Sequence, residues 1–241
     1  MKNSESKNRP AQKINEILEA IARDRTRTNL LNAYEQKALA YLVQHIPSWI
    51  SSDMLTAIGF IGNIIVFVSF ILASYLHMYY LLFGVLGFII SWFGDSLDGR
   101  VAYFRNKPRN KYGFTLDITM DWISIILIGY GFIIYAEGRW ELLGYSFVVM
   151  YGWEMIIALI RFKITGKYSI DAGKLGPTET RIAISAILIM EVFLKGSLMY
   201  SALVIVIVLF IVNVFDTRKM LLIADEIDTK ERAEQTGKKE L

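Results

Sequence analysis

The sequence predicts an all-α integral membrane protein with six transmembrane helices, preceded by an N-terminal interfacial amphipathic helix. Hydrophobic residues make up 54% of its 241 residues, more than an ordinary soluble domain contains. Six apolar segments follow one another at the length and spacing of membrane-crossing helices. Lys and Arg are concentrated in the ends of the chain and in alternate connections between these segments, as they are in multi-pass membrane proteins.

The predicted elements follow in order along the chain. Residues 1–30 are polar and mixed in charge, with no signal-peptide core, and should form a cytoplasmic tail. Residues 31–47 should form a juxtamembrane amphipathic helix that Pro47 ends. Its apolar face comprises Leu31, Tyr34, Ala38, Leu39, Tyr41, Leu42 and Ile46.

Residues 48–215 should form the six-helix domain. The expected spans are 54–75, 78–94 continuing as helix to Phe104, 113–136, 140–162, 179–194 and 198–215. Residues 216–241 are rich in charge and are expected to form a cytoplasmic C-terminal tail. Two acids inside the spans need a partner: Glu154 should pair with Arg161 or face a polar cavity, and Glu191 should snorkel to the far interface.

The basic residues predict the orientation in the membrane. Six spans place both termini on one side. Of the 26 Lys and Arg residues, 24 fall on that side, with 8 in residues 1–53, 5 in 98–113, 5 in 161–181 and 6 after 215. Only Arg139 and Lys195 fall on the other. The positive-inside rule therefore predicts cytoplasmic termini and cytoplasmic loops at 98–113 and 161–181.

Four aspartates lie in the stretch 95–121, which reads DSLDGRVAYFRNKPRNKYGFTLDITMD between two apolar segments. Asp95 and Asp98 are three residues apart, and Asp117 and Asp121 four apart, so each pair lies on one face of a helix. Ionisable side chains are costly at membrane depth, which favours a functional role. Carboxylate pairs from two helices suit two Mg²⁺ or Mn²⁺ ions, and two such ions can clamp a phosphoryl group.

The same stretch resembles the signature of the CDP-alcohol phosphotransferase family, D-x-x-D-G-x-x-A-R, then eight or nine residues, then G-x-x-x-D-x-x-x-D. The matching residues are Asp95, Asp98, Gly99, Ala102, Gly113, Asp117 and Asp121, while Tyr103 stands where the pattern has Arg. The resemblance implies an enzyme of phospholipid biosynthesis. It would transfer a phosphatidyl group from a CDP-linked lipid, usually CDP-diacylglycerol, to a small alcohol with release of CMP. It also implies a homodimer in the bilayer.

The resemblance implies roles for individual residues. Asp95, Asp98 and Asp117 would be metal ligands, and Asp121 both a ligand and the general base for the acceptor hydroxyl. Small residues would let phosphates approach the helices closely, and nearby cations would contact those phosphates in place of the missing Arg. These residues are Gly94, Gly99, Ala102 and Gly113, with Arg100 and Arg105. Thr56 could face the nucleotide or simply pack between helices.

The acceptor is less well determined by the sequence. The loop 161–181 carries Arg161, Lys163, Lys167, Lys174 and Arg181. These cations could bind a phosphorylated polyol such as inositol phosphate or glycerol phosphate, because Arg and Lys are the usual partners of phosphate. Basic cytoplasmic loops also serve to set topology, so both interpretations stay open.

Three other interpretations follow from the same residues. The four aspartates could form a salt-bridged network with Arg100, Arg105 and Lys111, although such a network would not require Gly99, Ala102 and Gly113. The protein could be a cation or proton transporter, but its acids lie near the helix ends rather than at the bilayer midplane. The protein could also be a catalytically inactive member of the family, because Tyr103 stands where the signature has Arg. No disulfide is possible without cysteine, and no nucleic-acid partner is expected.

Overall fold

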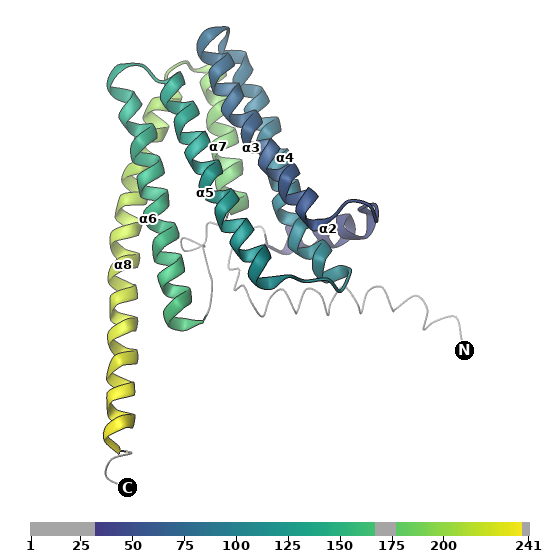
Figure 1. Cartoon of the computed structure of the whole chain (residues 1–241). Coiled ribbons are helices and arrows are strands. Elements are labelled where there is room, and N and C mark those ends of the chain that lie inside the picture. The colour runs from purple at the N-terminus through teal and green to yellow at the C-terminus, as the bar shows by residue number, and fades with distance from the viewer. Residues whose placement is uncertain (1–31, 167–176, 238–241) are drawn as a thin grey trace, which may run out of the picture.

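The chain folds into a bundle of long, roughly parallel helices with one helix lying across its end (Figure 1). The computed structural model describes residues 32–166 and 177–237, and the part described contains no β-strand. The elements are α2 Asn32–His45, α3 Ser52–Tyr75, the 3₁₀ turn η1 Met78–Tyr80, α4 Leu81–Phe104, α5 Asn110–Tyr135, the 3₁₀ turn η2 Gly138–Trp140, α6 Glu141–Thr165, α7 Pro177–Phe193 and α8 Ser197–Gly237. The predicted all-α fold is therefore confirmed.

Five helical segments are long and apolar enough to cross a membrane: Ser52–Tyr75, Met78–Phe104, Asn110–Tyr135, Gly138–Thr165 and Ser197–Ala233. They correspond to five of the six expected spans, so the protein is a multi-pass membrane protein. The remaining expected span, 179–194, corresponds to α7, which has 17 described residues. It packs beside α4 and α8 within the bundle (Figure 1). The sixth crossing stays a prediction.

Helices α3 and α4 approach so closely that glycines line their contact. A Cβ atom built on Gly62 would overlap the backbone of Gly87 and Ser91. One built on Gly94 would overlap the backbone of Gly59 and of Leu55. Small residues at such crossings let helix backbones pack together in a membrane. The prediction that Gly94 makes room for phosphates is thus wrong, because the space beside it is filled by α3.

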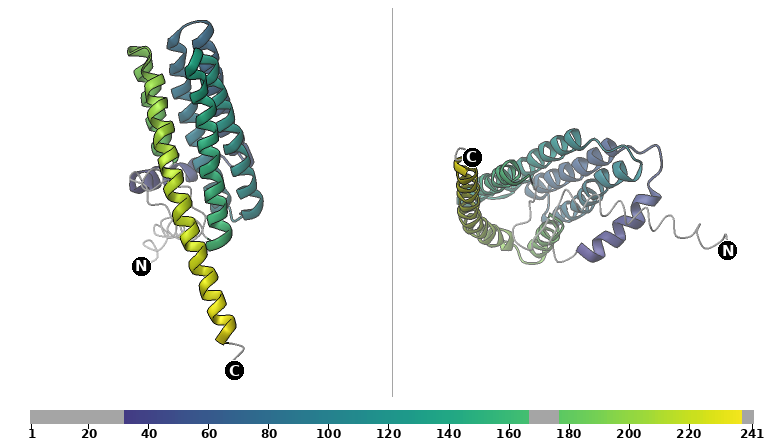
Figure 2. Two further views of the ribbon diagram at one scale, coloured as in Figure 1. Left: turned by 90° about the vertical axis from the view of Figure 1, so that its left-hand side faces the viewer. Right: turned by 90° about the horizontal axis from the view of Figure 1, so that it is seen from below.

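Helix α2 lies across the end of the bundle rather than along it, as the view from below shows (Figure 2). Its Leu39 and Val43 are buried in a cluster with Leu55 of α3 and with Leu97 and Val101 of α4. The predicted apolar face is only partly correct, because Tyr41 is 62% exposed. The buried face instead includes an acid, Glu35, one turn before Leu39.

The turn between α7 and α8 is organised by a buried carboxylate. Glu191 is 2% exposed and accepts hydrogen bonds from the Tyr135 hydroxyl (2.9 Å), the Gly196 N–H (2.9 Å), the Ser197 hydroxyl (3.2 Å) and the Leu198 N–H (2.7 Å). It therefore caps the first turn of α8, whose N–H groups have no partner within the helix. The prediction that Glu191 snorkels to the far interface is wrong, because its carboxylate is buried and hydrogen-bonded within the protein.

Helix α8 does not end where the charged residues begin. It continues as one helix from Ser197 to Gly237 and extends beyond the other helices (Figure 2). The charged segment after residue 215 is thus helical as far as Gly237.

Candidate active site

The four aspartates lie near the end of α4 and the start of α5, and these helix ends are on the side of the bundle that α2 crosses (Figure 1). Helix α4 carries Asp95 and Asp98 in its last three turns, and α5 carries Asp117 and Asp121 in its second and third turns. A short connection of residues 105–109 joins the two helices. Consequently, the acids of the two helices are brought to the same end of the bundle.

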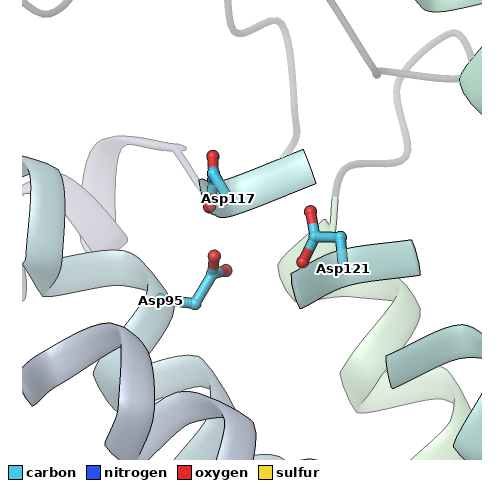
Figure 3. Close-up of side chains that lie close together, drawn as sticks. All are labelled: Asp95, Asp117 and Asp121. Atoms are coloured by element: carbon cyan, nitrogen blue, oxygen red, sulfur yellow. The ribbon is translucent and has the colours of Figure 1, made fainter. Parts of the chain in front are cut away.

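Three of the four carboxylates form a compact group. One carboxylate oxygen from each of Asp95, Asp117 and Asp121 lies within 4.8 Å of the other two, and all three residues are partly buried. Figure 3 shows the three side chains gathered around a common space. This donor set consists only of carboxylate oxygens, which fits a hard divalent cation such as Mg²⁺ or Mn²⁺.

Asp98 is held in a different way. Its Oδ2 accepts a hydrogen bond of 2.6 Å from the Thr56 hydroxyl, and its Oδ1 accepts one from the Gly99 N–H. Its backbone carbonyl accepts from the Ser52 hydroxyl at 2.8 Å. Helix α3 therefore fixes the orientation of Asp98, and the hydroxyl of Thr56 supports this carboxylate rather than acting only in helix packing.

A cavity of about 640 Å³ opens beside these acids. It is lined by Asp95, Asp98 and Asp117 and by the start of α3, the end of α4, the start of α5 and the end of α6. Gly99, Ala102 and Gly113 are among its lining residues, and a Cβ atom on either glycine would meet nothing within 4 Å. The space expected beside these small residues is thus open at both glycines, and Ala102 lines the same cavity.

The two predicted phosphate-binding arginines lie in different surroundings. Arg100 lines the cavity, is 6% exposed, and donates a hydrogen bond to the Ser96 carbonyl at 2.5 Å. Arg105 does not line the cavity. Its guanidinium donates to the carbonyls of Ile50, Pro47 and Ile46, which form the connection between α2 and α3. The environment of Arg105 therefore indicates a structural role.

Tyr103 is the residue that departs from the family signature. It lines the cavity, and its hydroxyl donates a hydrogen bond of 3.0 Å to the Asn110 side chain at the start of α5. The bond joins the two ends of the 105–109 connection.

A second set of residues at the rim was not found from the sequence. Arg109 forms an ion pair with Asp53 at the start of α3, and its guanidinium lies 4.2 Å from the centre of the Tyr112 ring. All three residues line the cavity. The hydrogen bond to Asp53 raises the pKa of Arg109 further above its already high value, so this cation stays charged. The signal in the sequence was the pair Arg109 and Tyr112 beside Pro108, but nothing there connected them with Asp53.

Of the five basic residues considered for the acceptor, Arg181 meets the acidic group. Its guanidinium lies 2.8 Å from Asp95 Oδ2, and it is close enough to Asp121 for an electrostatic interaction. Arg161 instead pairs with Asp216 of α8 at 3.3 Å, and Lys163 is exposed and does not line the cavity. Lys167 and Lys174 lie outside the described residues.

Glu154 of α6 is buried, with an exposed fraction of 5%. Arg161 and Asp216 are close enough to interact with it electrostatically. Neither of its oxygens has a hydrogen-bond partner among the described residues. The expected direct pairing with Arg161 is wrong, because Arg161 bonds to Asp216.

Fold and site together define a multi-pass helical membrane protein with three clustered carboxylates, a donor set that fits a divalent cation, beside a large cavity at one end of the bundle. Residues 49–213 match the family model of CDP-alcohol phosphatidyltransferase. The match covers more than half of the chain, which therefore belongs to this family of transferases. Searches of curated proteins and of solved structures gave no significant match.

Proposed function

We propose that the protein transfers a phosphatidyl group from CDP-diacylglycerol to the hydroxyl of a small alcohol and releases CMP, as a step in phospholipid biosynthesis. The observation that supports this best is the group formed by Asp95, Asp117 and Asp121 beside the 640 Å³ cavity. Family membership supports the donor class, because CDP-alcohols define the family.

The metal site would be formed by the four aspartates, with two Mg²⁺ or Mn²⁺ ions per site. When bound, these ions would neutralise the charge of the pyrophosphate and favour departure of CMP. Asp98 has its two oxygens oriented by Thr56 and Gly99, which preorganises it for this role. Asp98 is not part of the compact group of Asp95, Asp117 and Asp121. The four carboxylates would therefore be shared between two ion positions.

Asp121 is proposed as the general base. It lies one turn further along α5 than Asp117 and does not line the described cavity, whereas Asp117 does. An acceptor hydroxyl placed against Asp121 would thus approach the phosphate from the side opposite the CMP group. The carboxylate would take the hydroxyl proton as the new O–P bond forms and the bond to CMP breaks.

The nucleotide would occupy the cavity. Gly99, Ala102 and Gly113 leave room for its phosphates, Arg100 and Lys111 supply positive charge, and the Arg109–Tyr112 pair offers a planar surface at the rim. This set excludes Arg105, whose hydrogen bonds are used by the α2–α3 connection.

A phosphorylated polyol, such as inositol phosphate or glycerol phosphate, is the proposed acceptor. Arg181 supports this choice, because its guanidinium has five N–H donors and lies beside the acidic group, 2.8 Å from Asp95 Oδ2. We place the site and both termini in the cytoplasm, from the distribution of Lys and Arg. A homodimer is proposed from the family resemblance.

A screen of acceptors tests this function. The purified full chain is supplied with CDP-diacylglycerol and Mg²⁺ or Mn²⁺, and CMP release is measured with inositol phosphate, glycerol phosphate, inositol or serine. Release that requires a phosphorylated acceptor is expected. Turnover with unphosphorylated acceptors alone would overturn the acceptor assignment. No CMP release with any acceptor would favour an inactive family member, and cation flux in liposomes without CDP-lipid would favour a transporter.

The role of Asp121 is tested by Asp121→Asn, which keeps the shape and removes the base. Turnover should fall by at least a hundredfold, the lower end of the usual contribution of general base catalysis. Asp228→Asn, on the exposed end of α8, makes the same chemical change outside the site and should leave turnover unchanged. Wild-type turnover in Asp121→Asn would show that Asp121 is not the general base.

A further inference from the structure

We propose that Glu35 of α2 is a positioning residue for the metal site: it holds the first turn of α7 in place, so that Arg181 orients the carboxylate of Asp95. The proposal rests on the proposed function only in taking Asp95, Asp117 and Asp121 as metal ligands. It assigns to the crossing helix α2, which contributes no ligand itself, a part in determining the affinity for the metal.

Glu35 is an acid on the buried face of an amphipathic helix. It is 6% exposed, and its Oε1 accepts hydrogen bonds from the Thr178 hydroxyl at 2.9 Å and from the Trp92 indole N–H at 3.4 Å. Thr178 belongs to α7, Trp92 to α4 and Glu35 to α2. A single carboxylate thus joins three helices, and two of them carry residues of the site.

The start of α7 is held at two points. Thr178 bonds to Glu35, and Arg181, three residues later, forms the ion pair with Asp95. Residues three apart lie on neighbouring positions of one helical face, about 4.5 Å apart along the axis. A displacement of the turn at Thr178 therefore displaces the base of the Arg181 side chain by a similar amount.

Glu35 can act as a fixed point because α2 is itself anchored. Leu39 and Val43 fix its buried face against α3 and α4. Arg105, directly after α4, donates hydrogen bonds to carbonyls of the connection that follows α2. The position of Glu35 relative to Asp95 is consequently set by the packing of α2 on α4, without any contact to the cavity.

The ion pair with Arg181 engages Asp95 Oδ2 and fixes the rotation of the carboxylate. Hydrogen-bond partners of metal ligands orient those ligands, and their removal typically lowers metal affinity by 10–100-fold. An effect transmitted from Glu35 through α7 should be smaller than that of removing Arg181 itself, on the order of fivefold, the equivalent of one hydrogen bond.

The test measures Mn²⁺ binding to the purified full chain by electron paramagnetic resonance, which requires no turnover. Glu35→Met, which removes the acceptor, and, separately, Thr178→Val should each weaken Mn²⁺ binding about fivefold, and Arg181→Met about tenfold. In the Arg181→Met background, Glu35→Met should have less than a twofold further effect, because the connection to Asp95 is already lost. The matched control is Val66→Ala, in the other core cluster of the bundle, which should lower thermal stability with unchanged Mn²⁺ binding.

Several results would overturn the inference. One is unchanged Mn²⁺ binding in Thr178→Val, which removes the same hydrogen bond and remains informative if Glu35→Met folds poorly. Another is an undiminished fivefold effect of Glu35→Met in the Arg181→Met background, or an equal effect of Val66→Ala, either of which would indicate general loosening of the fold instead. If the protein binds Mn²⁺ as expected but releases no CMP with any acceptor, the proposed function fails while the positioning role of Glu35 stands.

Discussion

Two glycines five residues apart on α4 should respond in opposite ways to the same substitution. In Gly94→Ala the new Cβ atom meets the backbone of Gly59 and Leu55, which cannot rotate away, so α3 and α4 must move apart. Overpacking of this kind typically costs 1–3 kcal/mol, and the rigid contact argues for the upper end. The better helix propensity of Ala returns about 1 kcal/mol, leaving a net loss of about 2 kcal/mol.

In Gly99→Ala the new Cβ atom meets nothing within 4 Å. This variant should therefore be as stable as the wild type, or up to about 1 kcal/mol more stable. Because Gly99 lines the cavity beside Asp98, the added methyl group should obstruct the phosphates and lower kcat/KM for CDP-diacylglycerol, by about tenfold if it displaces one phosphate contact.

The assays are unfolding in detergent, followed by helical circular dichroism, and CMP release at varied CDP-diacylglycerol. Each variant serves as the control for the other, since both place one methyl group on the same helix. Wild-type stability of Gly94→Ala would refute the close packing of α3 on α4. A destabilised Gly99→Ala with an unchanged kcat/KM would refute the open space beside Asp98.

Three further outcomes are expected. Arg105→Met removes the donors to the carbonyls of Ile46, Pro47 and Ile50 and should lower the free energy of unfolding by about 2 kcal/mol, after allowance for the partial exposure of these bonds. KM for CDP-diacylglycerol should not change; a large rise in KM would instead indicate that Arg105 binds phosphate. Glu191→Ala leaves four donors at the α7–α8 turn without their acceptor and should cost about 3 kcal/mol in thermal unfolding; wild-type stability would contradict the capping role. Removal of divalent ions by a chelator should abolish CMP release, and Mg²⁺ or Mn²⁺ should restore it; turnover that persists after exhaustive chelation would exclude the metal-dependent reaction.

The local features of this protein were determined by its sequence alone. Apolar runs of membrane-spanning length require helices, because a backbone in lipid must satisfy its own hydrogen bonds. The i, i+3 and i, i+4 spacings of Asp95, Asp98, Asp117 and Asp121 place each pair on one helical face, whatever the rest of the chain does. The fold class and the two pairs of acids were therefore predictable without coordinates.

The tertiary structure decided what each of the other polar residues contacts, since such partners come from helices far apart in the sequence. Four arginines were expected near phosphates. In the structure Arg105 bonds to backbone carbonyls, Arg161 to Asp216 and Arg181 to Asp95, while Arg100 lines the cavity. The backbone of α3 fills the space beside Gly94, whereas the space beside Gly99 is open. The tertiary structure also brings Glu35 from an amphipathic helix to Thr178, 143 residues away. Spacing along one helix fixes which side chains share a face, but only the packing of helices against one another determines what that face meets.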